Sequence, residues 1–367
     1  MKSRAATLLL FIAAISLQAA EVKSPEIHPD GRVTFRLHAP KAKCVAVGGD
    51  FSKGKPLPMK RGTDGVWSRT AGPFAPDLYV YGFKVDAAGP MPDPANPAQF
   101  KRRGMTLSFL DVPGKKPRFF DARKVPHGQM HRHQYRSAIL KQQRNLVVYT
   151  PPGYRDGDKK FPVLYLLQGG GDTEEAWVQA GRIQPILENL FAENKARPMI
   201  VVMPDARGKS PFVGKGNALD RTKNFDEFES SMLRETLPFI QKNYRSNNRR
   251  AIAGFSVGAA LARRIGLRHL DQFQWVALMC GGTRLSDGHA VTLKLLLANP
   301  NQANAQLKLL WISAAPNNPN PFLARLNRAG LHPQTRPEPH RPSYRSCRHI
   351  LYHNFLPRLF QEKPHAD

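Results

Sequence analysis

A serine framed by two glycines stands where a short apolar segment meets an alanine-rich segment. Residues 254–258 read Gly-Phe-Ser-Val-Gly, with Arg-Ala-Ile-Ala before them and Ala-Ala-Leu-Ala-Arg-Arg after them. Because glycine adopts backbone conformations that other residues avoid, the chain can turn sharply here from a strand into a helix. Such a turn leaves the hydroxyl of Ser256 exposed above the helix N-terminus. A tight turn in which Ser256 only caps the helix is the alternative.

Strand and helix patterns alternate along the chain after about Phe119. We predict strands at residues 144–149, 163–167, 199–203, 251–253, 276–279 and 307–313, and helices at residues 183–193, 225–244, 257–267, 291–298, 321–329 and 349–361. This alternation predicts an α/β fold, in which a mostly parallel sheet is covered by helices on both faces.

The part of the chain before this region has a different rhythm. Short β-rich segments at residues 33–37, 44–48, 66–70 and 79–85 are separated by turns, which predicts a small all-β, immunoglobulin-like sandwich. A proline-rich stretch and a Pro-, Gly- and Lys-rich stretch follow, and strands do not continue through such segments. We therefore predict a β-sandwich at residues 21–114 and an α/β domain at residues 115–367. Trp67, Tyr79 and Tyr81 are expected in the sandwich core, with stacking on sugar rings as the alternative.

The first 20 residues have the order of a secretory signal. Met-Lys-Ser-Arg precedes an apolar run at residues 5–17, which Gln-Ala-Ala follows. A membrane span needs about 20 apolar residues, and this run is shorter. We predict cleavage after Ala19 or Ala20 and a periplasmic or secreted mature protein without a membrane span. A buried N-terminal helix or a membrane anchor is the alternative.

The chain is strongly basic. Its 55 Lys and Arg residues against 28 Asp and Glu give a formal net charge of +27 and a pI near 10.4. This charge favours contact with anions such as acidic polysaccharide, lipid headgroups or nucleic acid. Because the basic residues are scattered and no nucleic-acid module accompanies them, a solvated basic surface is expected and no specific nucleic-acid partner is predicted.

No metal or cofactor site is predicted. Cys44, Cys280 and Cys347 lie far apart without metal-ligand spacing, which predicts small buried or partly exposed thiols. One pair could still join in an oxidising compartment. His131 and His133 alternate as strand neighbours do, but no carboxylate or third ligand accompanies them.

A glycine loop follows the predicted strand at residues 163–167. Gln-Gly-Gly-Gly at residues 168–171 exposes backbone amides, which are suited to binding a developing negative charge on a substrate oxygen. We predict Gly170 as one oxyanion donor and Val257, beside the candidate nucleophile Ser256, as the other. A flexible turn or a phosphate cradle is the alternative, although the Lys-Ser/Thr ending of a P-loop is missing.

Several segments resemble one family. Residues 161–171, followed by Trp177, resemble the oxyanion segment of feruloyl-esterase and enterochelin-esterase type hydrolases, and residues 249–258 resemble their nucleophile elbow. Residues 147–154 resemble the entry strand of that family, and residues 355–360 resemble its closing helix. The N-terminal β-region resembles the early-set or glycogen-binding-like module often fused to these bacterial esterases. The resemblance implies an α/β-hydrolase fold and covers nearly the whole mature chain.

The acid of the expected Ser-acid-His order departs from the family pattern. The resemblance places it after the strand at residues 307–313, where this chain has Asn318, and no Asp or Glu lies between Asp287 and Glu338. Asparagine orients an imidazole but does not stabilise its charged form as a carboxylate does. Asp287 is the alternative acid, and a surface turn is its simpler role.

His340 is the nearest match to the family's base. An ungapped alignment on residues 355–360 would place Ser343 at that position instead. His349 and His353 are four residues apart, which puts both on one face of the final helix, where packed or exposed histidines are ordinary. The surrounding stretch, residues 316–348, is rich in Pro, Arg and Asn, which indicates local divergence or a compensated frameshift in this copy.

The leading hypothesis is a serine carboxylic-ester hydrolase that acts without a cofactor on an acylated carbohydrate or a phenolic ester of feruloyl or acetyl type. Its partners would be an acylated glycan or a small ester, together with anionic polysaccharide. The alternative is a catalytically impaired esterase-fold protein that binds glycan. A basic structural or nucleic-acid-associated protein is a third reading.

Overall fold

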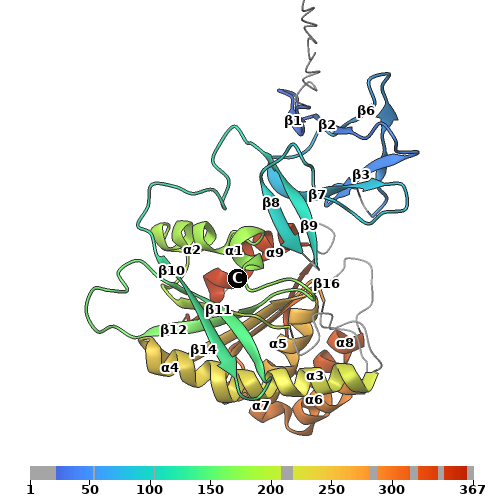
Figure 1. The fold of residues 1–367 in the computed structure, drawn as a ribbon. Coiled ribbons are helices and arrows are strands. Elements are labelled where there is room, and N and C mark those ends of the chain that lie inside the picture. The colour runs from blue at the N-terminus through green and yellow to red at the C-terminus, as the bar shows by residue number, and fades with distance from the viewer. Residues whose placement is uncertain are drawn as a thin grey trace, which may run out of the picture.

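The protein is described by a computed structural model that covers residues 22–52, 54–102, 104–207, 218–281, 287–314, 321–337 and 343–361. An N-terminal β-sandwich sits on a larger body of helices and strands (Figure 1). The predicted signal segment, residues 1–20, lies outside the described residues. Among the helices that are described, none is both long enough and apolar enough to cross a bilayer.

The N-terminal part, which we call the β-module, is built from two antiparallel sheets. Their strand orders are β1-β2-β6-β5 and β4-β3-β7-β9-β8. The strands are β1 Glu26–Ile27, β2 Val33–His38, β3 Val45–Gly49, β4 Leu57–Pro58, β5 Lys60–Arg61, β6 Val66–Ala71, β7 Asp77–Val85, β8 Gln99–Arg102 and β9 Met105–Val112. Side chains of both sheets share one core, which includes Trp67, Tyr79 and Tyr81. The all-β prediction and the core role of these three aromatics are confirmed.

Strand β7 is buried on both faces. Tyr79, Tyr81 and Phe83 point into the core of the β-module, whereas Leu78 and Val80 belong to the core of the larger body. Because successive side chains of a strand point to opposite faces, one strand serves two cores. The two parts of the chain are therefore joined by a strand that contributes to the core of each.

The larger body contains an eight-stranded sheet in the order β10-β11-β13-β12-β14-β15-β16-β17. Strand β11 is antiparallel to both neighbours, and every pair from β13 to β17 is parallel. The strands are β10 Gln129–Ser137, β11 Gln142–Thr150, β12 Phe161–Leu167, β13 Ile200–Pro204, β14 Ser246–Phe255, β15 Trp275–Met279, β16 Leu309–Ala314 and β17 Gln334–Pro337. The carboxyl ends of the parallel strands meet at one edge, where ligands of such sheets usually bind.

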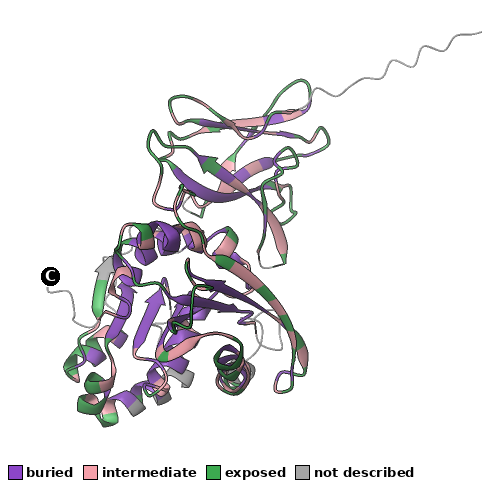
Figure 2. Cartoon of the chain, turned by 90° about the vertical axis from the view of Figure 1, so that its left-hand side faces the viewer, coloured by how far each residue is buried: buried purple, intermediate pink, exposed green. Residues whose placement is uncertain are grey.

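Helices cover both faces of this sheet, and its central strands are buried between them (Figure 2). Leu164 and Ala253 pack with α1, α2 and α9, whereas Val163 and Ile252 pack on the opposite face with α3 to α6 and α8. The helices are α1 Ala176–Gln179, α2 Ile183–Ala192, α3 Ala218–Ser231, α4 Leu237–Asn243, α5 Val257–Arg268, α6 Asp287–Ala298, α7 Pro300–Gln306, α8 Pro321–Arg328 and α9 Tyr344–Ile350. The predicted α/β arrangement is confirmed.

Two predicted helices differ in detail. The helix predicted at residues 225–244 is interrupted by a π-helical turn, Met232–Thr236, just before Pro238, which has no N–H to donate. The final helix begins earlier than predicted, at Tyr344, and ends in a π-helical turn, Leu351–Phe355, and a 3-10 turn, Leu356–Arg358. The sheet also has two edge strands that were not predicted, β10 and β17, because their sequences are largely polar.

The basic residues are not all at the surface. Among the described residues, five arginines are buried: Arg144, Arg250, Arg263, Arg264 and Arg348. Arg264 pairs with Glu229 and Asp226, and Arg263 lies over the ring of Phe322. These five arginines therefore belong to the interior, whereas the prediction of a solvated basic surface concerns the other basic residues and stays a prediction.

A carboxylate at the start of β7 links the β-module to α9. Asp77 is 2% exposed and accepts hydrogen bonds from Arg345 and Arg348, the latter at 2.8 Å. Arg348 also donates to the carbonyl oxygens of Leu78 and Ala180, so it joins three segments. Burial raises the pKa of Asp77, but hydrogen bonds from His349 and the two arginines outweigh it and hold that pKa well below its ordinary value.

We expect Asp77→Asn to lower the free energy of unfolding by about 3–5 kcal/mol, because it leaves buried arginine charges without their carboxylate. The carboxylate of Asp77 contributes its full stability above its unfolded pKa of about 3.9 and loses that contribution as the pH falls. In urea unfolding, the free energy of unfolding should therefore fall less between pH 7 and pH 3 for the variant than for the wild type.

The matched control is Asp30→Asn, which removes the carboxylate of an exposed pair with Arg32. Its cost should be far smaller than that of Asp77→Asn, because the pair is exposed to solvent. Equal costs for the two variants would contradict the structural role of Asp77.

Candidate active site

Ser256 lies in a sharp turn between β14 and α5. Its φ of 55° and ψ of −111° are strained for a residue with a side chain, at a cost of about 1–3 kcal/mol. The N–H of Ser256 donates to the carbonyl oxygen of Met279, at 3.0 Å, which ties the turn to the end of β15. Among the described residues, no amide of α5 is capped by the Ser256 side chain. The capping role considered as the alternative is therefore not observed.

Glycines allow this turn to form. A Cβ on Gly254 would lie 2.1 Å from the carbonyl oxygen of Gly258, and a Cβ on Gly258 would lie 2.4 Å from the carbonyl oxygen of Gln168. A Cβ on Gly281 would lie 2.9 Å from the Cα of Ser256. The ends of β12, β14 and β15 are thus in backbone contact around Ser256.

The glycine loop after β12 lies against the same turn. A Cβ on Gly170 would lie 2.8 Å from Cγ2 of Val257, the residue that follows Ser256. A Cβ on Gly169 would lie 2.9 Å both from Oδ2 of Asp172 and from the ring of Phe255. The structure therefore brings together Ser256, Val257 and Gly170, the predicted nucleophile and the two predicted oxyanion donors.

A buried tyrosine that the sequence did not single out stands behind this loop. Tyr344, the first residue of α9, accepts a hydrogen bond from the N–H of Gly169 at 3.3 Å and donates to Oδ2 of Asp172 at 3.0 Å. Its ring packs against those of Phe255 and Trp177. Burial, with the charge of Asp172, raises the pKa of Tyr344 well above its usual value, so the phenol stays protonated.

The structure describes no side chain of the other residues predicted for the triad. Asn318 and His340 lie outside the described residues, and Asp287 begins α6 but its side chain is outside the description. Ser343, the alternative position for the base, caps α9 by accepting from the N–H of Ser346. The rings of His349 and His353 stack at 5.9 Å, which confirms that they share one helix face.

Cys280 and Cys347 approach each other near this site. Both side chains are buried, and their sulfur atoms lie 3.9 Å apart, whereas Cys44 is exposed. The prediction of small buried or partly exposed thiols is confirmed.

The histidine pair on β10 makes ordinary polar contacts. His131 contacts the hydroxyl of Thr150 at 3.0 Å, and His133 contacts the hydroxyl of Tyr244 at 2.5 Å. Burial lowers the pKa of both imidazoles. In the part of the chain that the structure describes, no group of three His, Cys, Asp or Glu residues is arranged to hold a metal ion.

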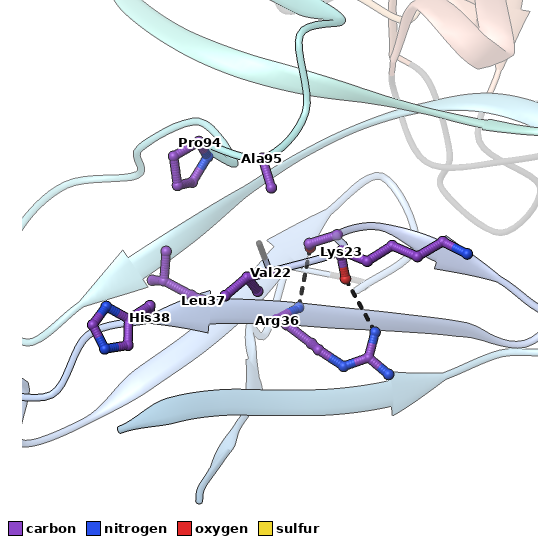
Figure 3. A pocket seen from close by; sticks show the side chains of 8 residues that line it. Val22, Lys23, Arg36, Leu37, His38, Pro94 and Ala95 are labelled. Atoms are coloured by element: carbon purple, nitrogen blue, oxygen red, sulfur yellow. Dashed lines mark hydrogen bonds between the residues drawn. The ribbon is translucent and has the colours of Figure 1, made fainter. Parts of the chain in front are cut away.

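A hollow lies on the β-module, far along the chain from Ser256. This cavity of about 660 Å³ is lined by Lys23, Arg36, Leu37, His38 and Pro94 among others (Figure 3). Arg36 donates there to the backbone oxygen of Lys23. None of the described residues that line it is Phe, Tyr or Trp, so they offer polar and cationic groups rather than an aromatic platform.

We expect Gly258→Ala to lower the free energy of unfolding by about 1–3 kcal/mol, because the added methyl group meets backbone oxygens that cannot move independently. Thermal and urea unfolding measure the change. Gly89→Ala is the control, since nothing lies within 4 Å of a Cβ built there. An unfolding midpoint for Gly258→Ala as high as that of the control would contradict the close contact.

Two protein families match this chain. The family described as "Putative esterase" matches residues 137–334, and carbohydrate-binding module 48, the isoamylase N-terminal domain, matches residues 22–98. The two matches fall on the α/β body and on the β-module respectively.

Longer proteins contain similar sequences. An endo-1,4-beta-xylanase/feruloyl esterase of Xylanibacter ruminicola is 31% identical over 277 residues, which is 72% of this chain and 37% of that protein. An esterase of Mycobacterium tuberculosis is 29% identical over 129 residues, which is 34% of this chain and 26% of that protein. The chain thus spans well under half the length of these relatives.

Solved structures share the fold. The enterobactin esterase of Shigella flexneri, determined with enterobactin, has a TM-score of 0.64 at 21% identity, over 88% of this chain and 92% of that one. A ferulic acid esterase of Anaeromyces mucronatus, determined with ferulic acid, has a TM-score of 0.55 at 21% identity, over 67% of this chain and 96% of that one. The first likeness extends across both the β-module and the α/β body.

Proposed function

Since this chain belongs to the esterase family, whose match covers more than half of it, we propose that it is a serine carboxylic-ester hydrolase with Ser256 as the nucleophile. The observation that carries the proposal is the strained turn at Ser256 with the glycine loop packed against it. Strain of this kind persists where function requires it, and here it presents a hydroxyl at the carboxyl end of a central strand.

We assign the larger body to the α/β-hydrolase fold. Its support is the position of Ser256 between β14, a strand with parallel neighbours on both sides, and α5. This strand-turn-helix context is the one in which a Gly-x-Ser-x-Gly motif serves as a nucleophile elbow.

The proposed reaction is acyl transfer to Ser256 followed by hydrolysis. The hydroxyl oxygen attacks the acyl carbon while His340 takes the proton, and the oxygen of the resulting tetrahedral intermediate accepts hydrogen bonds from the amides of Val257 and Gly170. The alcohol leaves with the proton from His340, and water then releases the acid. Asn318 would orient the imidazole, with Asp287 as the alternative.

The N-terminus of α5 would also stabilise the negative charge that develops on the substrate oxygen. This helix of 12 residues begins directly after Ser256, and the positive end of its dipole faces the position of the developing oxyanion. Preorganised dipoles of this kind usually supply a large share of catalysis in acyl transfer.

We propose an acylated carbohydrate, with a feruloyl- or acetyl-type acyl group, as the substrate class. The support is the feruloyl esterase activity for which the Xylanibacter ruminicola relative is named and the match of the β-module to a carbohydrate-binding family. The basic charge of the chain is suited to anionic polysaccharide as an additional partner. A periplasmic or secreted location, after removal of residues 1–20, agrees with a polymeric substrate.

A catalytically impaired glycan-binding protein is the second candidate. One observation favours it: the sequence has no carboxylate between Asp287 and Glu338, where the triad acid is expected. Binding of arabinoxylan combined with ester turnover no faster than that of the Ser256→Ala variant would establish this alternative.

We expect Ser256→Ala to lower kcat for p-nitrophenyl acetate and methyl ferulate by at least about 10³-fold, because the variant cannot form an acyl-enzyme. A fluorophosphonate should add one mass increment to the wild type at Ser256 and none to the variant. Ser68→Ala, a partly exposed serine of β6, is the control and should keep the wild-type rate. Equal rates for Ser256→Ala and the wild type would reject Ser256 as the nucleophile.

We expect Asn318→Asp to raise kcat by up to about 10⁴-fold, since a carboxylate stabilises the imidazolium that an amide can only orient. The gain must disappear in a variant that also carries His340→Ala. Stopped-flow hydrolysis of p-nitrophenyl acetate measures both rates.

His353→Ala, which changes an exposed histidine of the last helical segment, is the control. A fall in rate with Asp287→Asn and no gain with Asn318→Asp would instead assign the acid to Asp287.

A further inference from the structure

The β-module reaches the glycine loop through β8 and β9. Figure 1 shows these two strands extending from the sandwich toward α9. Phe100 of β8 is buried and packs edge-on against the ring of Tyr344, with ring centroids 6.4 Å apart. Arg102, at the end of β8, places its guanidinium 5.9 Å from the same ring.

A chain of polar contacts continues from Arg102 to the loop. Arg102 Nε lies 3.4 Å from Oδ1 of Asp172, and Oδ2 of Asp172 accepts the hydroxyl hydrogen of Tyr344 at 3.0 Å. The Tyr344 oxygen in turn accepts the N–H of Gly169 at 3.3 Å. The four groups come from β8, the glycine loop and α9.

These contacts are shielded from water. Asp172 is 1% exposed, Tyr344 is 2% exposed, and the side chain of Arg102 is 15% exposed. Hydrogen bonds to a charged group contribute more in such an environment than at a solvated surface. Arg102 of the β-module therefore places a positive charge beside the buried carboxylate of Asp172.

The glycine loop needs support from outside. Gly169 and Gly170 have no side chains of their own to anchor them, and Gly171 has a φ of 79°. Glycine backbones sample many conformations, whereas oxyanion donors must be fixed before the charge develops. Asp172 and Phe255 occupy the space where a Cβ of Gly169 would lie, so the loop is held by its neighbours.

We infer that Arg102, Asp172 and Tyr344 are positioning residues that hold the glycine loop against the Ser256 turn, so that the β-module is a part of the catalytic unit. The inference rests on the proposed function, because the loop is taken to carry the oxyanion donor Gly170. The three residues act through the loop and do not touch the reacting atoms.

The anchor at Asp77 makes this arrangement stable. Asp77 of β7 holds Arg345 and Arg348 of α9, and Tyr344 immediately precedes Arg345. The β-module thus contacts α9 through Asp77 and contacts the glycine loop through Arg102.

The experiment compares Tyr344→Phe, Arg102→Gln and Arg102→Lys with the wild type in the full chain. We expect kcat for p-nitrophenyl acetate to fall by about 10- to 100-fold in the first two variants, since a misplaced donor loop costs turnover. KM should change by less than about twofold, because this small ester does not depend on glycan contacts. Arg102→Lys should recover part of the loss, and Arg102→Gln combined with Tyr344→Phe should cost little more than Tyr344→Phe alone.

Hydrogen exchange provides a readout that does not depend on activity. Amides of residues 168–172 should exchange faster in Tyr344→Phe and Arg102→Gln than in the wild type. Arg32→Gln is the control, because it removes an ion pair of the β-module with Asp30 that lies away from the loop. It should leave both kcat and exchange unchanged.

The outcomes separate the inference from the proposed function. An active wild type whose kcat is unchanged by Tyr344→Phe overturns the inference and leaves the proposed function standing. If the wild type hydrolyses no ester, the proposed function fails. The hydrogen-exchange rates of residues 168–172 then test by themselves whether Arg102, Asp172 and Tyr344 hold the loop. Unchanged exchange at residues 168–172 in both variants overturns the inference in every case.

Discussion

The buried carboxylate of Asp77 is the contact on which the arrangement of the two parts depends. It begins β7, a strand whose opposite faces contribute Tyr79 to the β-module core and Leu78 to the core of the larger body. Apolar burial alone would allow sliding, because it is not directional. The hydrogen bonds from Arg345 and Arg348 are directional, and they fix α9 relative to β7.

The region around Ser256 shows how backbone contact replaces side-chain packing at a catalytic turn. Gly254, Gly258 and Gly281 let three strand ends approach to distances that no other residue permits. The turn is strained, and the surrounding sheet, buried on both faces, holds it in place. A rigid scaffold can therefore present both a hydroxyl and a glycine loop at one point, which is what acyl transfer requires.

Much of the fold follows from local patterns in the sequence. Strand and helix periodicity predicted the α/β body, and short strands between turns predicted the sandwich, because both patterns arise from neighbours in the chain. The polar edge strand β10 was missed, because its side chains are mostly exposed or half-buried and its sequence carries no apolar alternation. Tyr344, Asp172 and Arg102 were also missed. For β7 the sequence did carry a signal. Asp77 precedes an unbroken apolar run, and such a run is typical of a strand that is buried on both faces.

The sequence by itself determined the family, the strand-to-helix turn at Ser256 and the glycine loop, because each depends on residues close together in the chain and on what glycine alone can adopt. The tertiary structure decided which residues support that turn. Asp77 and Arg345 are 268 positions apart, and Gly169 and Tyr344 are 175 positions apart. Contacts across such separations leave no periodic trace in a sequence, since they form only when folding brings buried polar groups into reach of one another.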